Sequence, residues 1–448
     1  MKKQLTIEEK LQNALVPKEE QPYKIPSNWC WGILGEITSV IGGGTPSSKI
    51  NEYYDNGDIA WITPSDLSNY NNMYISKGKK MITKLGLMKS SAKLLPKGTV
   101  CLSSRAPIGY VVIAKNELST NQGFKSFLPS KVFKSEYLYW YLKSIKHILE
   151  AKASGTTFLE LSAKKAGEVE IPLPPINEQQ RIVNRIESLF AKLDRVKELI
   201  ENTLAQFEQN KMAILHKAFT GELTAKWRKE NNIDLSSWEK IKLGKVLLPM
   251  QTKKPTGQFF RYIDIDAIDN KRQIVKAPKL ILTEKAPSRA SRGVETGNIL
   301  FSMVRPYLKN IAQIDSDLSD CIASTGFYVC RCKPELNSRF LYYLFIFDKT
   351  IDYLMQFMKG DNSPSIRKDD LLNMKIDLPT IEEQQEIVNI LDNLLAKYNK
   401  IKNLEQQLEK IELLKKAILA KAFRGELGTN NPDEESAENL LKEILAEK

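Results

Sequence analysis

The chain has 448 residues, of which 42% are hydrophobic and 27% are charged, and its net charge at pH 7 is +12. A chain of this length is too long for a single hydrophobic core, so about two or three domains of globular composition are expected. No apolar run reaches the roughly 18 residues that a membrane span needs, and five cysteines without a CxxC pair favour neither a disulfide framework nor a metal site. We therefore expect a cytoplasmic protein without a membrane segment.

The positive charge is unevenly distributed along the chain. Residues 428–448 carry six acidic residues and two lysines, so the preceding residues hold all of the positive excess. Such an excess indicates a polyanionic partner, although a scattered basic surface can also serve only to keep a protein in solution.

The first predicted element is a helical segment within residues 1–21. Thr6 and Glu9 have the spacing of a capping box, and Glu8 and Glu9 interrupt the apolar stretch that a signal peptide would need. Residues 22–175 follow as a first globular domain. Its β-branched runs, such as TVCLSS and YVVIA, are broken by Gly, Pro, Asn and Ser, which predicts short strands.

Two long helices are predicted, the first within residues 176–227 and the second within residues 381–427. Each would end near a glycine, Gly221 or Gly425, and each would be roughly 60 Å long. Their apolar residues recur in alternating steps of four and three, and in the first helix this seam includes Val196. Such narrow seams favour packing of the two helices on each other, antiparallel, or self-association with a second chain.

A second globular domain is expected between the helices, at residues 228–380, and an acidic tail after them, at residues 428–448. The chain contains an internal repeat, in which PPINEQQRIVNRIESLFA at 174–191 matches PTIEEQQEIVNILDNLLA at 379–396. The two domains are also distantly alike, since Trp29, Leu34 and Gly35 have counterparts in Trp238, Leu243 and Gly244, and KGTVCLSSRAPIG at 97–109 resembles TGNILFSMVRPYL at 296–308. The predicted fold is α+β: two mixed α/β domains separated by two long helices packed as an antiparallel coiled coil, with a pseudo-two-fold internal repeat.

With this order of elements the chain resembles the specificity subunits of type I restriction-modification systems over essentially its whole length. The resemblance is carried by the helix openings IPLPPINEQQRIV and IDLPTIEEQQEIV, by the closings KAFTGEL and KAFRGEL, and by IGGGTPS and WITPSDL in the first domain. The second domain has MQTKKPTG in place of a GGGTPS segment, which leaves its DNA-contacting loops less well defined.

The resemblance implies that each domain is a target recognition domain, which reads one half of a split sequence in double-stranded DNA. It also implies two modification (methyltransferase) subunits and two restriction (motor and nuclease) subunits as partners. S-adenosylmethionine and ATP with Mg²⁺ are then expected on those partners, and no cofactor on this chain. A stand-alone bipartite DNA-binding or regulatory protein, an interaction scaffold, and the specificity subunit of a fused nuclease-methyltransferase system are the alternatives.

No catalytic motif is found in the sequence, which has no GxxxxGK[ST], HExxH or NPP[FY] segment, so we expect no catalytic centre on this chain. The resemblance then implies a non-catalytic subunit of an adenine-specific methyltransferase and ATP-dependent endonuclease complex. For DNA contact, polar residues that follow a predicted strand into a turn are favoured, because they can reach base edges or phosphates. The candidates are Thr45, Lys49, Ser103, Ser104, Arg105, Thr156, Thr157, Lys164, Ser302, Arg305, Lys309, Ser363 and Arg367.

The outward faces of the long helices are the predicted surface for partner subunits, because the seam residues are used between the helices. The candidates lie in the first turns, where acidic residues can equally be solvated and favour the helix dipole. They are Glu178, Gln179, Gln180, Arg181, Glu382, Glu383, Gln384 and Gln385.

Overall fold

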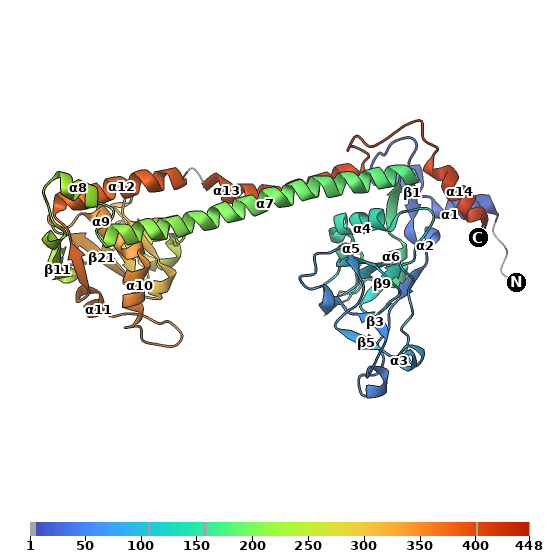
Figure 1. Cartoon of the computed structure of the whole chain (residues 1–448), viewed down its shortest axis with the longest axis horizontal. Helices are drawn as coiled ribbons and strands as arrows, with labels where there is room; N and C mark the ends of the chain where they lie inside the picture. Colours follow the sequence, from blue (N-terminus) through green and yellow to red (C-terminus); the bar gives the residue numbers. More distant parts are fainter. Residues whose placement is uncertain (1–5, 106, 156–158, 400–401, 448) are drawn as a thin grey trace. The chain divides into compact units, whose positions relative to one another are not determined.

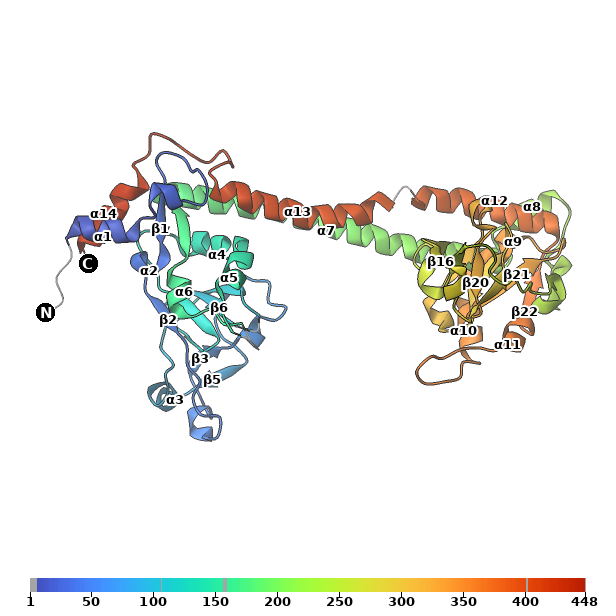
Figure 2. The ribbon, with the colours of Figure 1, turned by 180° about the vertical axis from the view of Figure 1, so that it is seen from behind.

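The computed structural model describes residues 6–105, 107–155, 159–399 and 402–447. These residues form two compact units: unit 1 comprises the chain up to Glu198 together with the chain from Gln407 onward, and unit 2 comprises Leu199–Gln406. Each unit contains one mixed α/β domain and a part of each long helix (Figures 1 and 2). None of the helices in the described ranges is both long and apolar enough to cross a membrane.

The domain of unit 1 is built on two sheets. The larger has the strand order β2-β9-β6-β7-β4 and the smaller has the order β5-β3-β8. Their strands are β2 (Val40–Gly42), β3 (Ile59–Ile62), β4 (Tyr74–Ile75), β5 (Lys80–Ile82), β6 (Val100–Ser103), β7 (Val111–Ala114), β8 (Ser119–Thr120) and β9 (Phe124–Phe127). A further antiparallel pair joins β1 (Cys30–Ile33) to β10 (Glu170–Leu173), so the two ends of the domain lie side by side.

The central strand β6 contributes to two hydrophobic cores, because side chains alternate along a strand. Val100 and Leu102 pack on the helical side, whereas Cys101 packs on the side of the smaller sheet. The helices of the domain are α1 (Ile7–Ala14), α2 (Leu34–Ile37), α3 (Lys84–Met88), α4 (Ser135–Ser144), α5 (Lys146–Lys152) and α6 (Ala163–Gly167). Helix α4 lies against the long helix α7, where the rings of Trp140 and Phe190 have centroids 5.0 Å apart.

The domain of unit 2 repeats this arrangement. Its sheets have the orders β12-β21-β18-β19 and β16-β13-β20-β17, so β18 lies between β21 and β19 as β6 lies between β9 and β7. The strands are β11 (Glu239–Lys242), β12 (Leu247–Leu248), β13 (Phe259–Ile263), β14 (Ile268–Asp269), β15 (Ile274–Val275), β16 (Lys279–Leu282), β17 (Ala290–Gly293), β18 (Ile299–Ser302), β19 (Ile311–Gln313), β20 (Ile322–Ser324), β21 (Phe327–Cys332) and β22 (Lys375–Leu378). The helices are α8 (Ala225–Glu230), α9 (Ser338–Ile346), α10 (Asp348–Met355) and α11 (Lys368–Leu372).

The predicted long helices are present. The first, α7, is continuous over Ile176–Phe219, and Gly221 follows it with a φ of +80°. The second is described as α12 (Ile381–Asn399) and α13 (Lys402–Phe423), with residues 400 and 401 outside the described residues.

Within unit 1, α7 and α13 pack antiparallel. Lys415 Nζ lies 2.5 Å from Asp194 Oδ1 and Lys197 Nζ lies 4.0 Å from Glu412 Oε1, so the helices run in opposite directions. Val196, predicted in the seam, is 46% exposed, so that prediction is wrong.

The C-terminal residues belong to the fold of unit 1, which the prediction of an acidic tail missed. Helix α14 (Ala437–Glu447) places Leu441, Ile444 and Leu445 in the core. It packs against α1 (Figure 1). The acidic residues of this segment occupy its outer side, and its apolar residues fix it to the domain.

Candidate nucleic-acid interface

The first candidate region is the loop that leaves β6 in unit 1. Ser103 Oγ donates to the Pro107 carbonyl at 2.7 Å and accepts from the Tyr110 amide at 2.8 Å, so it closes the loop. The Ser104 amide donates to the Gly123 carbonyl at 2.7 Å, and both serines are 0% exposed. The Ser103 hydroxyl therefore holds the loop, and the Ser104 hydroxyl accepts from Lys125 Nζ at 3.4 Å, so both are used within the domain, which corrects their prediction as DNA contacts.

Arg105 lies where this loop meets residues 154–160. Its guanidinium is 3.9 Å from Glu160 Oε2, and Lys125 Nζ is 3.3 Å from Glu160 Oε1. Ser154 and Glu160 exchange two backbone hydrogen bonds of 3.1 and 3.0 Å, which closes the second loop. Arg105 keeps about a third of its side chain exposed and remains available to an anion. Thr156 and Thr157 lie outside the described residues.

Thr45 and the GGGTPS segment lie on the neighbouring side of the same loop. Thr45 is exposed, and its hydroxyl hydrogen-bonds the side chain of Gln122, next to the Gly123 that holds Ser104. A Cβ at Gly43 would lie 1.9 Å from the Asn121 carbonyl, so close packing of two backbones requires glycine there. The structure thus brings Thr45 together with the loop of Arg105.

Two further predicted residues of unit 1 are exposed, and no described contact joins them to that loop. Lys49 lies in the segment after β2, and Lys164 lies on α6 with its Nζ 3.9 Å from Glu168. Both stay predicted DNA contacts, able to reach phosphates or base edges.

Unit 2 repeats the paired loops. Lys359 and Ser365 exchange two backbone hydrogen bonds of 3.0 Å, and the Ile366 amide donates to the Met303 carbonyl as the Leu161 amide donates to that of Ser104. This register matches Arg105 with Val304, one residue before Arg305. The same pairing follows from the predicted resemblance of residues 97–109 to residues 296–308, which the structure confirms.

Ser302 and Lys309 are structural members of the unit 2 loop. Ser302 is 1% exposed and its hydroxyl donates to the Val304 carbonyl at 2.8 Å, which corrects its prediction as a DNA contact. Lys309 Nζ donates to the Ile346 carbonyl at 3.1 Å and forms an ion pair with Asp348, so its charge is already balanced.

Arg305 is exposed and has a left-handed backbone with a φ of 49°. Its amide donates to the Pro364 carbonyl at 2.8 Å, and its Nη2 donates to the Asn362 carbonyl at 2.9 Å. A non-glycine residue in this conformation persists only when its surroundings fix it, which is typical of binding sites. Arg305 thus supports residues 359–365, on which Ser363 is exposed.

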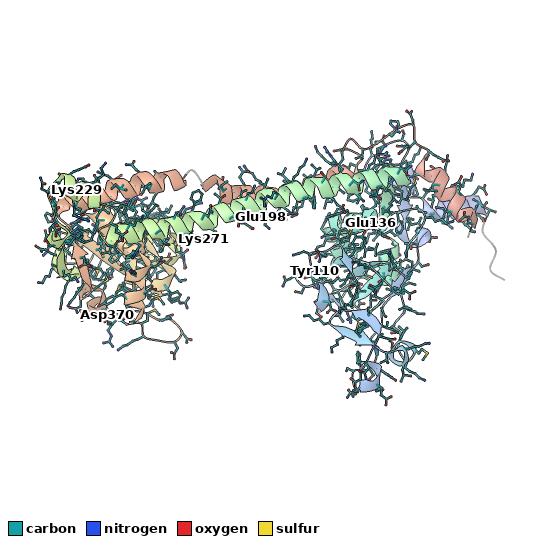
Figure 3. The ribbon with its side chains drawn as sticks, in the orientation of Figure 1. Tyr110, Glu136, Glu198, Lys229, Lys271 and Asp370 are labelled. Atoms are coloured by element: carbon teal, nitrogen blue, oxygen red, sulfur yellow. The ribbon has the colours of Figure 1, made fainter. Side chains whose placement is uncertain are left out.

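Arg367 is the N-cap residue of α11. It directly follows the loop of residues 359–365, and its side chain is exposed. Its amide donates to Asp370 Oδ2 at 2.7 Å, so its backbone role is clear from the local sequence. Figure 3 labels Asp370 at this end of unit 2.

A notch of about 540 Å³ opens beside Arg305 and Ser363. Asp266, Asn270 and Asn310 also line it. These three residues were not predicted from the sequence, because nothing in the local pattern separates them from ordinary polar loop residues. The available signal was that Asn310 stands directly before strand β19, at the mouth of a predicted site loop.

The helix starts predicted for partner contact are largely buried. Glu178, Gln179, Glu383 and Gln384 are all 0% exposed. The prediction that these side chains lie on an outward face is wrong, because each holds a domain onto its helix.

The two glutamines make matching contacts. Gln179 Nε2 donates to the carbonyls of Val132 and Pro174 at 2.9 and 3.0 Å, and its Oε1 accepts from the Lys134 amide at 2.8 Å. Gln384 does the same with the Glu335 and Pro379 carbonyls and the Asn337 amide.

The two glutamates each accept from a tryptophan. Trp29 Nε1 donates to Glu178 at 2.8 Å, and Trp238 Nε1 donates to Glu383 at 2.9 Å. Burial raises the pKa of Glu178. Arg228 Nη1 lies 2.5 Å from Glu383 Oε1 and is itself 7% exposed, so unit 2 contains a buried ion pair.

The other four helix-start candidates keep some exposure. Arg181 forms two hydrogen bonds of 2.8 and 2.7 Å with the Glu434 carboxylate. Gln180 and Gln385 donate to the asparagine one turn later, and Glu382 is exposed. In the described ranges, no group of three or more His, Cys, Asp or Glu residues could hold a metal ion.

Comparison with known proteins gives consistent matches. The model of the type I restriction modification DNA specificity domain matches twice, at residues 26–206 and 238–413. The specificity subunit of the type I restriction enzyme MjaIX from Methanocaldococcus jannaschii is 30% identical over 441 residues, which is 92% of this chain and 96% of that protein.

Solved structures show the same fold. A chain from a study of complex assembly and conformational transition of the type I R-M system has a TM-score of 0.69 at 22% identity, covering 91% of this chain and 100% of that one. The HsdS subunit from Thermoanaerobacter tengcongensis has a TM-score of 0.58 at 22% identity, with the same coverage.

Proposed function

The chain belongs to the type I restriction-modification DNA specificity family, and we propose that it is the non-catalytic subunit that reads a bipartite target in double-stranded DNA, one half-site per domain. The observation that carries the proposal is the double match to the specificity domain, at residues 26–206 and 238–413. Each matched range contains one copy of the paired loops, the first after β6 and the second after β18.

The two units share a backbone arrangement at these loops but carry different side chains at matching positions. Strand β9 carries Lys125 beside Glu160, whereas the matching positions in unit 2 are Tyr328 and Ser365. Arg105, which is about a third exposed, and Arg305, which is exposed, supply positive charge at the two loops. Phosphate contacts position a protein on DNA and contacts to base edges specify sequence, so a shared scaffold with different loops suits two unlike half-sites.

The partner subunits are proposed to be two methyltransferase subunits and two motor and nuclease subunits. S-adenosylmethionine and ATP with Mg²⁺ would be bound by those partners and not by this chain. In unit 1 the paired helices expose Val196, Leu413 and Leu414 at 46%, 63% and 50%. Exposed apolar side chains grouped on a helix surface are typical of a protein interface. This surface replaces the buried residues as the proposed partner contact, and Gln180 and Arg181, about four turns away on α7, stay proposed contacts as well.

The test is co-expression with the cognate methyltransferase subunit, followed by sequencing that maps methylated adenines on the host DNA. The expected result is methylation at one split, asymmetric sequence that disappears when this chain is omitted. Absence of both a complex and dependent methylation would instead favour a stand-alone DNA-binding protein. A single partner that both cleaves and methylates would identify a fused nuclease-methyltransferase system.

A further inference from the structure

The notch of unit 2 is lined by an asparagine whose side chain has no hydrogen-bond partner among the described residues. Asn310 is 6% exposed, and its side chain forms no hydrogen bond with any residue that the structure describes. Its polar atoms are not completely buried, so the amide reaches the notch with its donor and its acceptor unused. The unpaired amide therefore points to a ligand with both a donor and an acceptor.

The rest of the notch suits a nucleobase. Ile268 and Leu308 provide apolar walls, and Arg305 and Ser363 stand on the loop beside them. An asparagine amide matches the edge of adenine, since its NH₂ group donates to N7 and its carbonyl accepts from the N6 amino group. Arg305, already tied to residues 362 and 364, supplies a cation for the adjoining phosphate.

The same backbone position carries a different side chain in unit 1. The Ser103 amide donates to the Tyr110 carbonyl at 2.8 Å, as the Ser302 amide donates to the Asn310 carbonyl at 3.1 Å. Tyr110 thus corresponds to Asn310, and Figure 3 labels it on the domain of unit 1. A residue that determines specificity needs a fixed backbone position and a side chain that differs between recognition domains. This position has both properties.

Resting on the proposed function, we propose that Asn310 reads an adenine in the half-site recognised by unit 2, and that Tyr110 occupies the equivalent reading position in unit 1. Lys309 is paired with Asp348, and the Ser302 hydroxyl donates to the Val304 carbonyl, so neither competes for this role.

The experiment uses the complete chain in complex with its methyltransferase subunits. Methylated sequences are mapped for the wild type, Asn310→Ala, Asn310→Asp and Tyr110→Ala. We expect each Asn310 variant to relax one base pair in one half-site, with a loss of preference of roughly 5- to 150-fold, while the other half-site is unchanged. Tyr110→Ala, the matched control, should alter only the other half-site.

A chemical substitution then tests the contact directly. Each adenine of the relaxed half-site is replaced in turn by 7-deazaadenine, which lacks the N7 acceptor. At one position wild-type binding should weaken about fivefold or more, and Asn310→Ala should lose nothing further there.

Three outcomes decide the inference. An unchanged methylated motif in both Asn310 variants overturns it, and the proposed function stands if the wild type still methylates a split sequence. Independent, additive losses from 7-deazaadenine and Asn310→Ala also overturn it, because the two would then not touch. If Asn310→Ala fails to assemble, Asn310→Asp gives the decision, since it keeps the side-chain volume and removes the donor.

Discussion

The two helix starts use the same sequence motif in different electrostatic settings. In both, a tryptophan and a glutamine join the domain to the helix. Glu383 has the buried cation Arg228 at 2.5 Å, whereas Glu178 has the neutral donors Asn430 at 2.9 Å and Thr429 at 3.3 Å.

The shared motif therefore gives both units the same contacts between domain and helix. The residues around the motif determine whether the buried glutamate has a cation or only neutral donors beside it. In unit 2 the covering segment follows α7, and in unit 1 it is the C-terminal segment that follows α13. In unit 1 the arginine near this glutamate is Arg181. It is held at the surface by the Glu434 carboxylate and the Thr429 carbonyl. The three changes below test this comparison.

Deletion of residues 428–448 is expected to have the largest effect and to act on unit 1. It removes the donors to Glu178 and uncovers the core positions of Leu441, Ile444 and Leu445, each worth about 1.5–3 kcal/mol of burial. The free energy of unfolding of unit 1 should fall by about 5 kcal/mol or more, measured by hydrogen exchange resolved along the chain.

Unit 2 supplies the control for this deletion, because residues 199–406 keep all of their own covering segment. Equal loss of protection in both units would contradict the assignment of the C-terminal segment to unit 1.

Glu383→Gln should destabilise unit 2 by about 3–5 kcal/mol, because it leaves the buried guanidinium of Arg228 without its counter-charge. The new NH₂ group would also face either Trp238 Nε1 or the Arg228 and Thr224 donors. Urea unfolding followed by hydrogen exchange in residues 199–406 measures the loss.

The matched control for Glu383→Gln removes both charges. Arg228→Met combined with Glu383→Gln should recover most of the stability, since it also removes the guanidinium that the single variant leaves without a counter-charge. A double variant as unstable as Glu383→Gln would show that packing, and not the unpaired charge, is responsible.

The sequence predicted the scaffold well because its signals are local. Proline-led openings, heptad spacing and Gly221 set the bounds of α7 within a few residues, and the repeat predicted a second copy of the domain. The β6 and β18 strands were likewise visible as apolar runs.

The site was less predictable because burial depends on distant residues. Glu178 looks like a solvated helix start, and only Trp29, 149 residues away, makes it a buried acceptor. The paired tryptophans Trp29 and Trp238 were noticed as repeats, but no local pattern links them to these glutamates. Ser103 has the same difficulty, since its hydroxyl closes a loop whose shape the sequence does not specify.

Glu178→Gln should have the smallest effect on stability, and the size of that effect should depend on pH. A glutamine keeps an oxygen for Trp29 and Asn430 and presents its NH₂ group to the Thr429 hydroxyl, so at neutral pH the free energy of unfolding of unit 1 should change by less than about 1 kcal/mol. Burial raises the pKa of Glu178 in the folded protein, so the folded state binds the proton more tightly than the unfolded state.

The wild type should therefore lose stability relative to Glu178→Gln as the pH rises from the unfolded pKa, about 4.3, through the raised pKa of the folded state, and the difference should become constant above it. Chemical denaturation of both proteins across this range gives the difference at each pH. Parallel profiles would contradict the comparison, because they would mean that Glu178 is ionised as readily in unit 1 as in the unfolded chain, despite having no cation as close as Arg228 is to Glu383.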